Sequence, residues 1–173
     1  MNLYDTMTRE VRELFPMDKN SVRFYSCGPT VYGPAHIGNF RTFVMQDVFR
    51  RVLETSGQKT FHVRNLTDVD DKTIRQSKEQ GVKLEDFTDK WTARFRKDCE
   101  LLNLLTPHAE PSAVEHIPEQ ISLIERLIEG GKAYRASDGS VYFKVDAFPE
   151  YGRLSRLADR EITTSETDRE TSD

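Results

Sequence analysis

The sequence predicts an α/β fold built on a parallel sheet, and three consecutive segments carry that prediction. Residues 21–26 contain a short apolar run, 22–25, typical of a buried strand, residues 36–55 have helical apolar spacing, and residues 59–66 alternate apolar with polar side chains. Two strands joined by a crossover of this length pair in parallel within a right-handed unit. Ligands bind beyond the carboxyl ends of such strands, so Cys27 and residues 65–68 are expected to meet there.

The elements around this unit follow from local patterns. Residues 3–9 are a short lead-in that packs or forms an edge strand, and residues 10–20, which contain Phe15-Pro16, are expected to form a loop. Gly57 suits a helix C-cap. The helix over 36–55 is expected to bury an apolar stripe at helical spacing, namely Val44, Met45, Val48, Phe49, Val52 and Leu53.

Three further helices are predicted downstream. Acidic residues favour the positive start of a helix that opens at Asp70-Asp71 and runs to about residue 79. A helix over about 85–105 has apolar side chains four apart, namely Phe87, Trp91, Phe95 and Cys99. After a loop with two prolines, the last helix closes at Gly130-Gly131. It carries an isoleucine stripe: Ile117, Ile121, Ile124 and Ile128.

The remaining chain is predicted to be a hairpin and a tail. Residues 133–135 and 141–143 flank a glycine-containing turn and are expected to pair as a β-hairpin. Residues 159–173 are polar and almost free of apolar side chains, so we expect a disordered tail or a linker.

Composition limits the classes of function. The chain of 173 residues has room for one domain with or without a small insert, and 25 Lys and Arg against 29 Asp and Glu leave a net charge of −4. Residues 159–173 carry six acids and two bases, so the rest is neutral and has no global basic field for nucleic acid. Two distant cysteines suggest no disulfide framework. Without a long apolar run or a signal-like N-terminus, a cytoplasmic protein with no membrane partner is expected.

The stretch from Cys27 to Asn39 is the candidate binding site. A strand, a Gly/Pro-rich turn and a helix start gather backbone N–H groups at a positive helix end, which suits a phosphate group. There His36 can donate to phosphate oxygens, Gly38 lets a base or ribose approach, and Asn39 adds a polar contact. Such donors favour reactions in which negative charge builds on phosphate. The structural alternative is that His36 only caps the helix and Gly38 only allows close packing.

Two neighbouring features also have competing interpretations. Cys27 is either a small buried hydrophobe or a zinc ligand, although no partner follows at zinc-finger spacing. The carboxylates of residues 68–71 could bind the magnesium that ATP chemistry needs, but helix capping by Asp68 or Asp70 is the stronger explanation. Thr67, at a strand end, is the better candidate for direct ligand contact.

Taken together, these residues resemble the N-terminal part of cysteinyl-tRNA synthetase, a class I aminoacyl-tRNA synthetase. The resemblance runs from residue 3 to about 156. Four stretches carry it: the Cys-Gly-Pro-Thr-Val-Tyr turn at 27–32, the HIGH-type signature at 36–39 in a variant ending in Asn, the Thr-Asp-Val-Asp-Asp-Lys segment at 67–72, and the insert hairpin at 132–143. Together they are highly specific, whereas none is so alone.

The resemblance implies a fold and a domain order. Residues 1–80 would be the first half of a Rossmann-like nucleotide-binding catalytic domain. Residues 81–158 would be a mainly helical connective insert with a β-hairpin, followed by the polar tail at 159–173.

It also implies a reaction and its residues. Cysteine and ATP would form cysteinyl-adenylate and pyrophosphate, and the cysteinyl group would then pass to its tRNA. His36 and Asn39 would be catalytic; magnesium would accompany ATP in a site formed by Thr30, His36, Gly38 and Asn39. Gly28 and Thr67 would line the amino-acid pocket. Cys27 would be one of four ligands to a zinc ion, which prefers thiolate and so rejects serine.

The chain departs from the family in what it lacks. The other zinc ligands, the Lys-Met-Ser-Lys-Ser-type loop and the anticodon-binding domain have no counterpart here, so the chain is expected to be inactive alone and to need a complementing C-terminal half. Half a doubly wound sheet would also leave an apolar face and a strand edge uncovered. Two alternatives remain: a cysteine–amino-sugar ligase of mycothiol synthesis, and a non-catalytic nucleotide-binding paralogue or interaction module. The lead-in, Val31-Tyr32 and residues 67–72 favour the synthetase.

Overall fold

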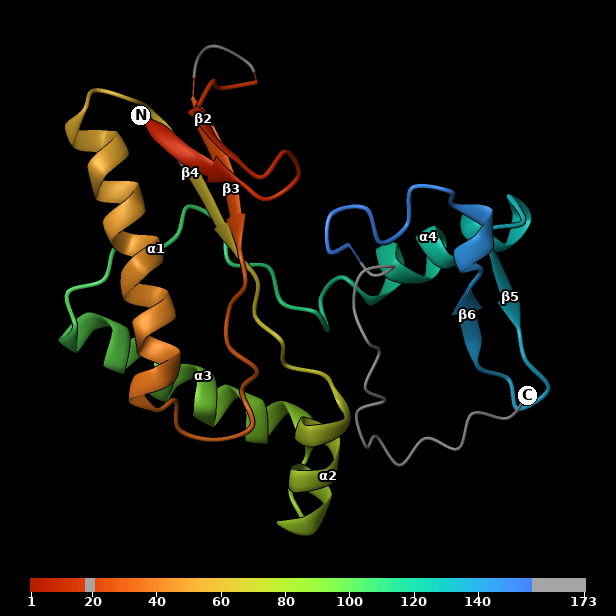
Figure 1. The fold of residues 1–173 in the computed structure, drawn as a ribbon. Helices are drawn as coiled ribbons and strands as arrows, with labels where there is room; N and C mark the ends of the chain where they lie inside the picture. The colour runs from red at the N-terminus through yellow and green to blue at the C-terminus, as the bar shows by residue number, and fades with distance from the viewer. Residues whose placement is uncertain (18–20, 157–173) are drawn as a thin grey trace. The chain divides into compact units, whose positions relative to one another are not determined.

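The computed structural model describes residues 1–17 and 21–156, which form two compact units (Figure 1). One unit is Phe15–Ser122, and the other combines Met1–Leu14 with the chain from Leu123 onward. The functional division expected at residue 80 stays a prediction. The tail expected over 159–173 lies outside the described residues.

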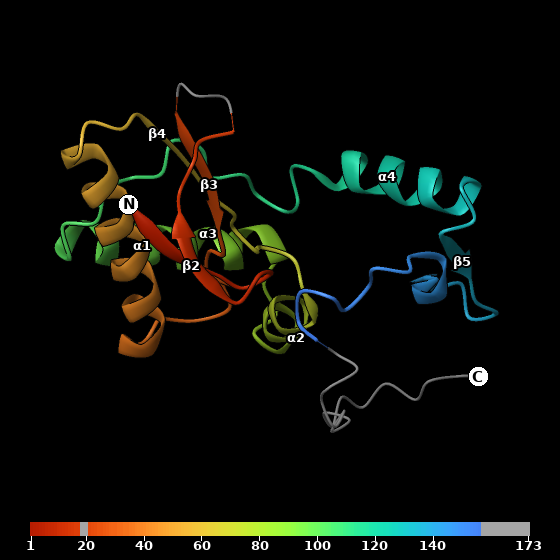
Figure 2. The same ribbon diagram turned by 45° about the horizontal axis from the view of Figure 1, so that its top comes forward.

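The unit Phe15–Ser122 is built on the expected strand–helix–strand motif. β3 (Val22–Ser26) and β4 (Thr60–Arg64) pair in parallel, from Val22 opposite Thr60 to Ser26 opposite Arg64, and α1 (Ile37–Thr55) connects them. In both views α1 runs along the same side of the two strands (Figures 1 and 2). The predicted parallel pair and its connecting helix are confirmed.

A third chain segment, residues 108–113, continues this sheet, although a loop was expected there. Beyond β4, Arg64 N donates to Ala109 O at 3.0 Å and Leu66 N donates to Pro111 O at 2.8 Å. Parallel bridges join Val63 to Ala109 and Leu66 to Ser112. The outer edge of β4 is therefore covered, whereas β3 pairs only with β4 among the described residues.

The core between α1 and the following helices is aromatic. Phe40, Phe43, Phe95 and Cys99 form the buried cluster, with the Phe43 and Phe95 ring centroids 5.0 Å apart. Burial raises the pKa of the Cys99 thiol, so this side chain behaves as a small apolar group. As predicted, α3 (Leu84–Leu101) turns its Phe87, Phe95 and Cys99 inward.

The predicted apolar stripe of α1 is confirmed at Leu53, which is buried, and at Phe49, whose ring centroid lies 5.0 Å from that of Phe24, but its valines are wrong. Val44, Val48 and Val52 are 38%, 46% and 45% exposed, while Phe40, Phe43 and Leu53 are buried. Successive helical residues differ by about 100° around the axis, so the phenylalanine face and the valine face cannot both meet the sheet. The aromatic side chains bury more area per residue and take the inner face.

Two helix ends show the local chemistry that sets them. α2 (Asp71–Glu79) begins as predicted, with Asp70 as its N-cap accepting from Thr73 N at 2.8 Å. α3 ends at Leu101, earlier than the expected residue 105, and Asn103 has a left-handed φ of 54°. Asparagine tolerates that conformation better than most residues, so it stops the helix there.

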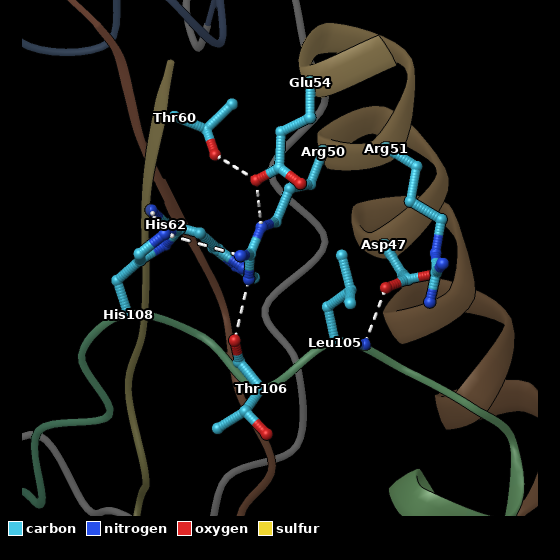
Figure 3. Close-up of polar contacts among 9 residues, drawn as sticks. All are labelled: Asp47, Arg50, Arg51, Glu54, Thr60, His62, Leu105, Thr106 and His108. Carbon is cyan, nitrogen blue, oxygen red and sulfur yellow. Dashed lines mark hydrogen bonds and ion pairs between the residues drawn. The ribbon is translucent and has the colours of Figure 1, made fainter.

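Charged side chains of α1 hold the chain that follows α3 (Figure 3). Arg50 Nη1 donates to the carbonyl of Thr106 at 2.7 Å, and Asp47 accepts from the backbone N–H of Leu105 at 2.8 Å. Glu54 accepts from Arg50 Nε at 2.7 Å, which keeps the guanidinium in place. These bonds set the position from which residues 108–113 run alongside β4.

The second unit consists of short elements. β1 (Asn2–Asp5) and β2 (Glu10–Glu13) form an antiparallel hairpin, so the loop expected over residues 10–20 is wrong at its start. The two strands pair through their backbones although the local sequence is polar. Arg12 of β2 also forms an ion pair with Asp5 of β1 at 3.1 Å. The predicted hairpin of β5 (Ala133–Arg135) and β6 (Val141–Phe143) is confirmed, and a short 3₁₀ helix η1 (Val145–Ala147) follows.

α4 (Ile117–Glu129) is the predicted isoleucine helix, and it crosses the boundary between the two units. Gly131, with a φ of 66°, follows its end. Its stripe of isoleucines is 37–51% exposed. None of the helices in the described residues is long and apolar enough to cross a membrane.

Candidate functional site

The turn that follows β3 opens into a cavity of about 270 Å³. Of the predicted site residues, Gly28, Thr30 and Asn39 line it. The other lining residues come from the same turn, from α1 and from the two following helices: Pro29, Val31, Tyr32, Gly33, Pro34, Ala35, Phe43, Lys72 and Phe95. This volume lies just below the usual range for small-molecule pockets and suits an amino acid better than a whole nucleotide.

The two strand ends meet as predicted. Val31 N donates to Thr67 O at 3.1 Å and Thr67 N donates to Pro29 O at 3.0 Å, so Thr30 and Thr67 face each other as parallel bridge partners. Thr67 does not itself line the cavity but lies beside Thr30, which does. The predicted amino-acid residues, Gly28 and Thr67, therefore belong to one connected backbone arrangement.

Gly28 occupies a position where no side chain fits. A Cβ built on it would lie 1.7 Å from the carbonyl oxygen of Asn65 and 2.8 Å from its carbon. Both atoms belong to the backbone, so neither can move away as a side chain would. The turn therefore needs glycine because two backbones touch, which brings Cys27 close to the end of β4.

His36 and Asn39 form a reciprocal cap at the start of α1. His36 Nδ1 accepts from Gly38 N at 3.0 Å, and Asn39 Oδ1 accepts from His36 N at 3.1 Å. The structural alternative considered for this motif is thus present in the structure. The cap uses only Nδ1 of His36 and Oδ1 of Asn39, so Nε2 of His36 and Nδ2 of Asn39 remain available to a ligand.

The cap also determines which ring nitrogen of His36 carries the proton. Because Nδ1 accepts a hydrogen bond, the neutral imidazole must hold its proton on Nε2. Asn39 likewise keeps its Nδ2 amide, since Oδ1 is used in the cap. Both side chains are exposed at a positive helix end, so they can present N–H donors to an anion.

Gly38 is packed against the His36 ring. A Cβ at this position would lie 2.8 Å from Cε1 and 3.0 Å from Nδ1 of His36. The absence of a side chain therefore lets the ring fold back over the first turn of α1.

Cys27 places an exposed thiol at the front of the turn. Its carbonyl accepts from Gln46 Nε2 at 3.0 Å, which ties the turn to α1. Among residues 1–17 and 21–156, no group of three or more His, Cys, Asp or Glu side chains could hold a metal ion. Zinc needs four ligands in a structural or substrate-binding site, so the described part of this chain does not fit a complete zinc centre.

The acidic residues after β4 are engaged in local structure. Asp70 caps α2, as described above. Asp68 accepts from the Ser112 hydroxyl and, at 3.0 Å, from Val114 N, which holds the end of the third chain segment. The capping interpretation is confirmed for Asp70, and Asp68 has a bridging role that its position in the sequence did not reveal.

Positive charge lies at the cavity wall. Lys72 Nζ lies 5.2 Å from the centroid of the Tyr32 ring, a cation–π distance. Arg64, only 5% exposed, lies 5.0 Å from the centroid of the Phe95 ring and donates to Glu110 at 2.7 Å. Lys72 belongs to a sequence motif that gave it no role, and Arg64 had no sequence signal because its partner is 46 residues away.

A buried histidine lies beneath the turn. His62 is 3% exposed, stacks on Phe24 at 4.4 Å, and has Nε2 2.7 Å from the Ser26 hydroxyl. Burial first, and then the guanidinium groups of Arg64 and Arg50, lower its pKa to about 4. His62 is therefore neutral near pH 7.

The neighbouring His108 is fixed by the backbone of β4 (Figure 3). Its Nδ1 accepts from His62 N at 3.0 Å, so Nε2 carries the proton in the neutral ring. Arg50 Nη2, at 3.4 Å from Nε2, is then a close neighbour and not an effective donor. His108 is thus held against β4 by a backbone hydrogen bond, with Arg50 beside its ring.

Asn65 is the functional candidate that the sequence analysis missed. Its side-chain Oδ1 accepts from Gly28 N at 2.8 Å and from the Tyr25 hydroxyl at 2.9 Å. Partial desolvation, with the Cys27 thiol nearby, raises the pKa of Tyr25 and keeps this hydroxyl a donor. The available signal was its place at the carboxyl end of β4, directly opposite the turn.

This geometry defines a class: a βαβ unit whose first turn and helix start form a nucleotide-type cup, as in class I synthetases. Comparison with known proteins agrees. The family described as "tRNA synthetases class I (C) catalytic domain" matches residues 13–173, and the chain belongs to that family.

The similar sequences are longer than this chain. A cysteine–tRNA ligase from Opitutus terrae is 56% identical over 165 residues, covering 94% of this chain and 36% of the relative. One from Methanosarcina acetivorans is 49% identical over 157 residues, covering 91% of this chain and 33% of the relative. The chain thus spans about a third of the length of the curated relatives it matches.

A solved structure shares the fold. The crystal structure of a ternary LeuRS–tRNA–LeuAMS complex from Agrobacterium radiobacter K84 matches with a TM-score of 0.60 and 20% sequence identity. The match covers 67% of this chain and 15% of that one. It supports the class I synthetase architecture, a Rossmann-like parallel sheet with helices.

Proposed function

We propose that this chain forms the N-terminal, ATP- and cysteine-binding part of a cysteine–tRNA ligase. In this reaction a carboxylate oxygen of cysteine attacks the α-phosphorus of ATP, the bond to the β-phosphate oxygen breaks, and pyrophosphate leaves with the electron pair. The cysteinyl group of the adenylate then passes to a tRNA hydroxyl, releasing AMP. Family membership and the relatives' names support the reaction, and the start of α1 supports the residues.

The single observation that carries the proposal is the reciprocal cap of His36 and Asn39. It fixes two side chains with their N–H groups free at a positive helix end. Negative charge on the α-phosphate grows as the new bond forms, and donors placed in advance stabilise it without reorganising. Thr30 and Gly38 complete the proposed ATP site, the first in the cavity wall and the second as the floor under the His36 ring.

The amino-acid half of the proposed site draws on both strand ends. Gly28 lines the cavity, and Thr67 pairs with Thr30 beside it. The volume of about 270 Å³ suits cysteine. The backbone contact between Gly28 and Asn65 fixes this part of the cavity wall.

Metals and partners follow from the same proposal. Magnesium would accompany ATP. Cys27 would supply one thiolate to a zinc ion whose other ligands come from outside the described residues, and zinc bound there would favour a substrate thiolate over a hydroxyl. The tRNA, and a C-terminal half that completes the catalytic domain, are the proposed macromolecular partners, and the cytoplasm is the proposed location.

The test is amino-acid-dependent exchange of pyrophosphate into ATP by this chain together with the proposed complementing C-terminal half. We expect exchange with cysteine, and at least about 100-fold less with serine, as for a site that binds one group and rejects its analogue. Residues 1–173 alone should give none. Zinc content provides a second readout: Cys27→Ser should lower it, while Cys99→Ser, at a buried position away from the turn, should not. Exchange that ignores cysteine would overturn the proposal.

A further inference from the structure

The side chain of Asn65 joins three parts of the site. It follows β4 directly and reaches across to the turn after β3. Its Oδ1 accepts from Gly28 N at 2.8 Å and from the Tyr25 hydroxyl at 2.9 Å, while its Nδ2 donates to Thr67 Oγ1 at 2.9 Å. The candidate thiol turn and the candidate amino-acid residue Thr67 are thus linked through one amide.

Chemistry fixes which way this amide points. The backbone N–H of Gly28 can only donate, so the atom facing it must be the amide oxygen of Asn65. The amide nitrogen must then face Thr67. Since Thr67 Oγ1 accepts from that nitrogen, the hydroxyl proton of Thr67 remains available for another acceptor.

Few other side chains could replace Asn65. The backbones of Gly28 and Asn65 are in contact, so the linking side chain must be short. Aspartate has the right length but no donor, and the Thr67 hydroxyl would then turn toward it. With aspartate at position 65, the lone pairs of Thr67 Oγ1, in place of its hydroxyl proton, would face the ligand. Alanine would leave the Gly28 N–H and the Tyr25 hydroxyl without their shared acceptor.

We propose that Asn65 is a positioning residue for amino-acid recognition: it fixes the Cys27-Gly28 turn and makes Thr67 a hydrogen-bond donor toward an anionic group of the bound amino acid. This inference rests on the proposed function, in which Gly28 lines the amino-acid cavity and Thr67 lies beside Thr30 at its edge. Asn65 itself acts through these two residues and does not need to touch the ligand.

The experiment uses this chain together with the proposed complementing C-terminal half and compares four variants of this chain with the unaltered one. Asn65→Asp keeps the shape and the acceptor but removes the donor to Thr67. Thr67→Val removes the hydroxyl, and the double variant combines both changes. Asn103→Asp is the matched control, because Asn103 is exposed and its side chain is far along the chain from the turn. Exchange of pyrophosphate is measured against cysteine and against ATP separately.

For Asn65→Asp we expect the KM for cysteine to rise at least about tenfold, while the KM for ATP stays within about twofold, since one charge-assisted hydrogen bond is lost. The double variant should be no worse than Thr67→Val alone, because both changes act through one hydroxyl. Asn103→Asp should match the unaltered protein. Equal effects on cysteine and ATP, or effects of the two single changes that multiply, would overturn the inference.

Hydrogen exchange in residues 1–173 tests the geometry without activity. The Gly28 amide should be protected in the unaltered chain and in Asn65→Asp, and should lose at least about tenfold of its protection in Asn65→Ala. Unchanged protection in Asn65→Ala contradicts the proposed link. If the unaltered polypeptide shows no cysteine-dependent exchange, the proposed function fails and this inference fails with it. If it exchanges normally and Asn65→Asp has an unchanged cysteine KM, only the role of Asn65 is refuted.

Discussion

Replacing Gly28 with alanine should disrupt the site through the backbone alone. The added Cβ would lie 1.7 Å from the Asn65 carbonyl oxygen, where even 3.0 Å is close, so the two strand ends must separate by about 1.3 Å. That movement breaks the 2.8 Å bond from Gly28 N to Asn65. Overpacking of about 1–3 kcal/mol and one lost hydrogen bond of about 1 kcal/mol give a loss of about 2–4 kcal/mol.

The assay is thermal and urea unfolding of residues 1–173, with Gly33→Ala as the control in the same turn. A Cβ on Gly33 meets nothing within 4 Å, so this variant should unfold like the unaltered chain. For a chain of this size, Gly28→Ala should lower the Tm by about 5–15 °C. Equal midpoints for the two alanine variants would refute the reasoning, because the difference between them depends only on the backbone contact.

Three more outcomes follow from single contacts. Folding lowers the pKa of His62 from 6.5 to about 4, so the unfolded chain takes up a proton at a higher pH than the folded chain does. The free energy of unfolding should therefore drop as pH falls from about 6.5 to 4, by at most about 3 kcal/mol. Urea unfolding at a series of pH values should show this slope, and His62→Gln should remove it. Gly38→Ala should change the Tm little, because the helix propensity gained with alanine is offset by the lost cap bond from Gly38 N to His36 Nδ1. It should slow pyrophosphate exchange about 10–100-fold by displacing the His36 ring, and an unchanged rate would argue against a role for that ring. Glu110→Ala should cost about 3–5 kcal/mol in urea unfolding by leaving the Arg64 guanidinium buried and unpaired, whereas Arg64→Met with Glu110→Leu should cost far less.

The fold was predictable where local pattern and topology agree. The strand–helix–strand unit could be read from apolar runs of the right length, and the parallel pairing followed from the crossover. Asp70 could be identified as a cap because its carboxylate needs only a neighbour three residues on. These are short-range rules, and they held.

The failures have a common physical cause, which is packing between distant segments. Periodicity shows that α1 has apolar faces but not which of them the sheet covers, so the valine stripe was chosen over Phe40 and Phe43. The strand-like pairing of residues 108–113 depends on bonds from α1 and β4, with no pattern of its own. Pairing of β2 with β1 likewise overrode a polar local sequence.

The candidate site was predictable in part for the same reason. Motif spacing located His36, Gly38 and Asn39 at the helix start, but not the cap that sets the His36 tautomer. The joining role of Asn65 required the contact of two backbones 37 residues apart. Sequence alone could place that residue at the correct strand end and go no further.

Apolar side chains on the two paired strands are exposed among the described residues. Tyr25 and Phe61 are 62% and 44% exposed on the strands, and β3 pairs with one strand only among the described residues. An uncovered face and edge were expected for half of a doubly wound sheet.

The role of His36 at the α-phosphate can be tested with His36→Asn in this chain, assayed together with the proposed complementing C-terminal half. Asparagine is among the best helix N-caps, so the cap and the stability should survive while the Nε2 donor is lost. We expect an unfolding midpoint close to that of the unaltered protein and a cysteine-dependent exchange rate lower by about 100–1,000-fold. If His36→Asn instead exchanges pyrophosphate at the unaltered rate, His36 is only a helix cap and the proposed role at the α-phosphate is wrong.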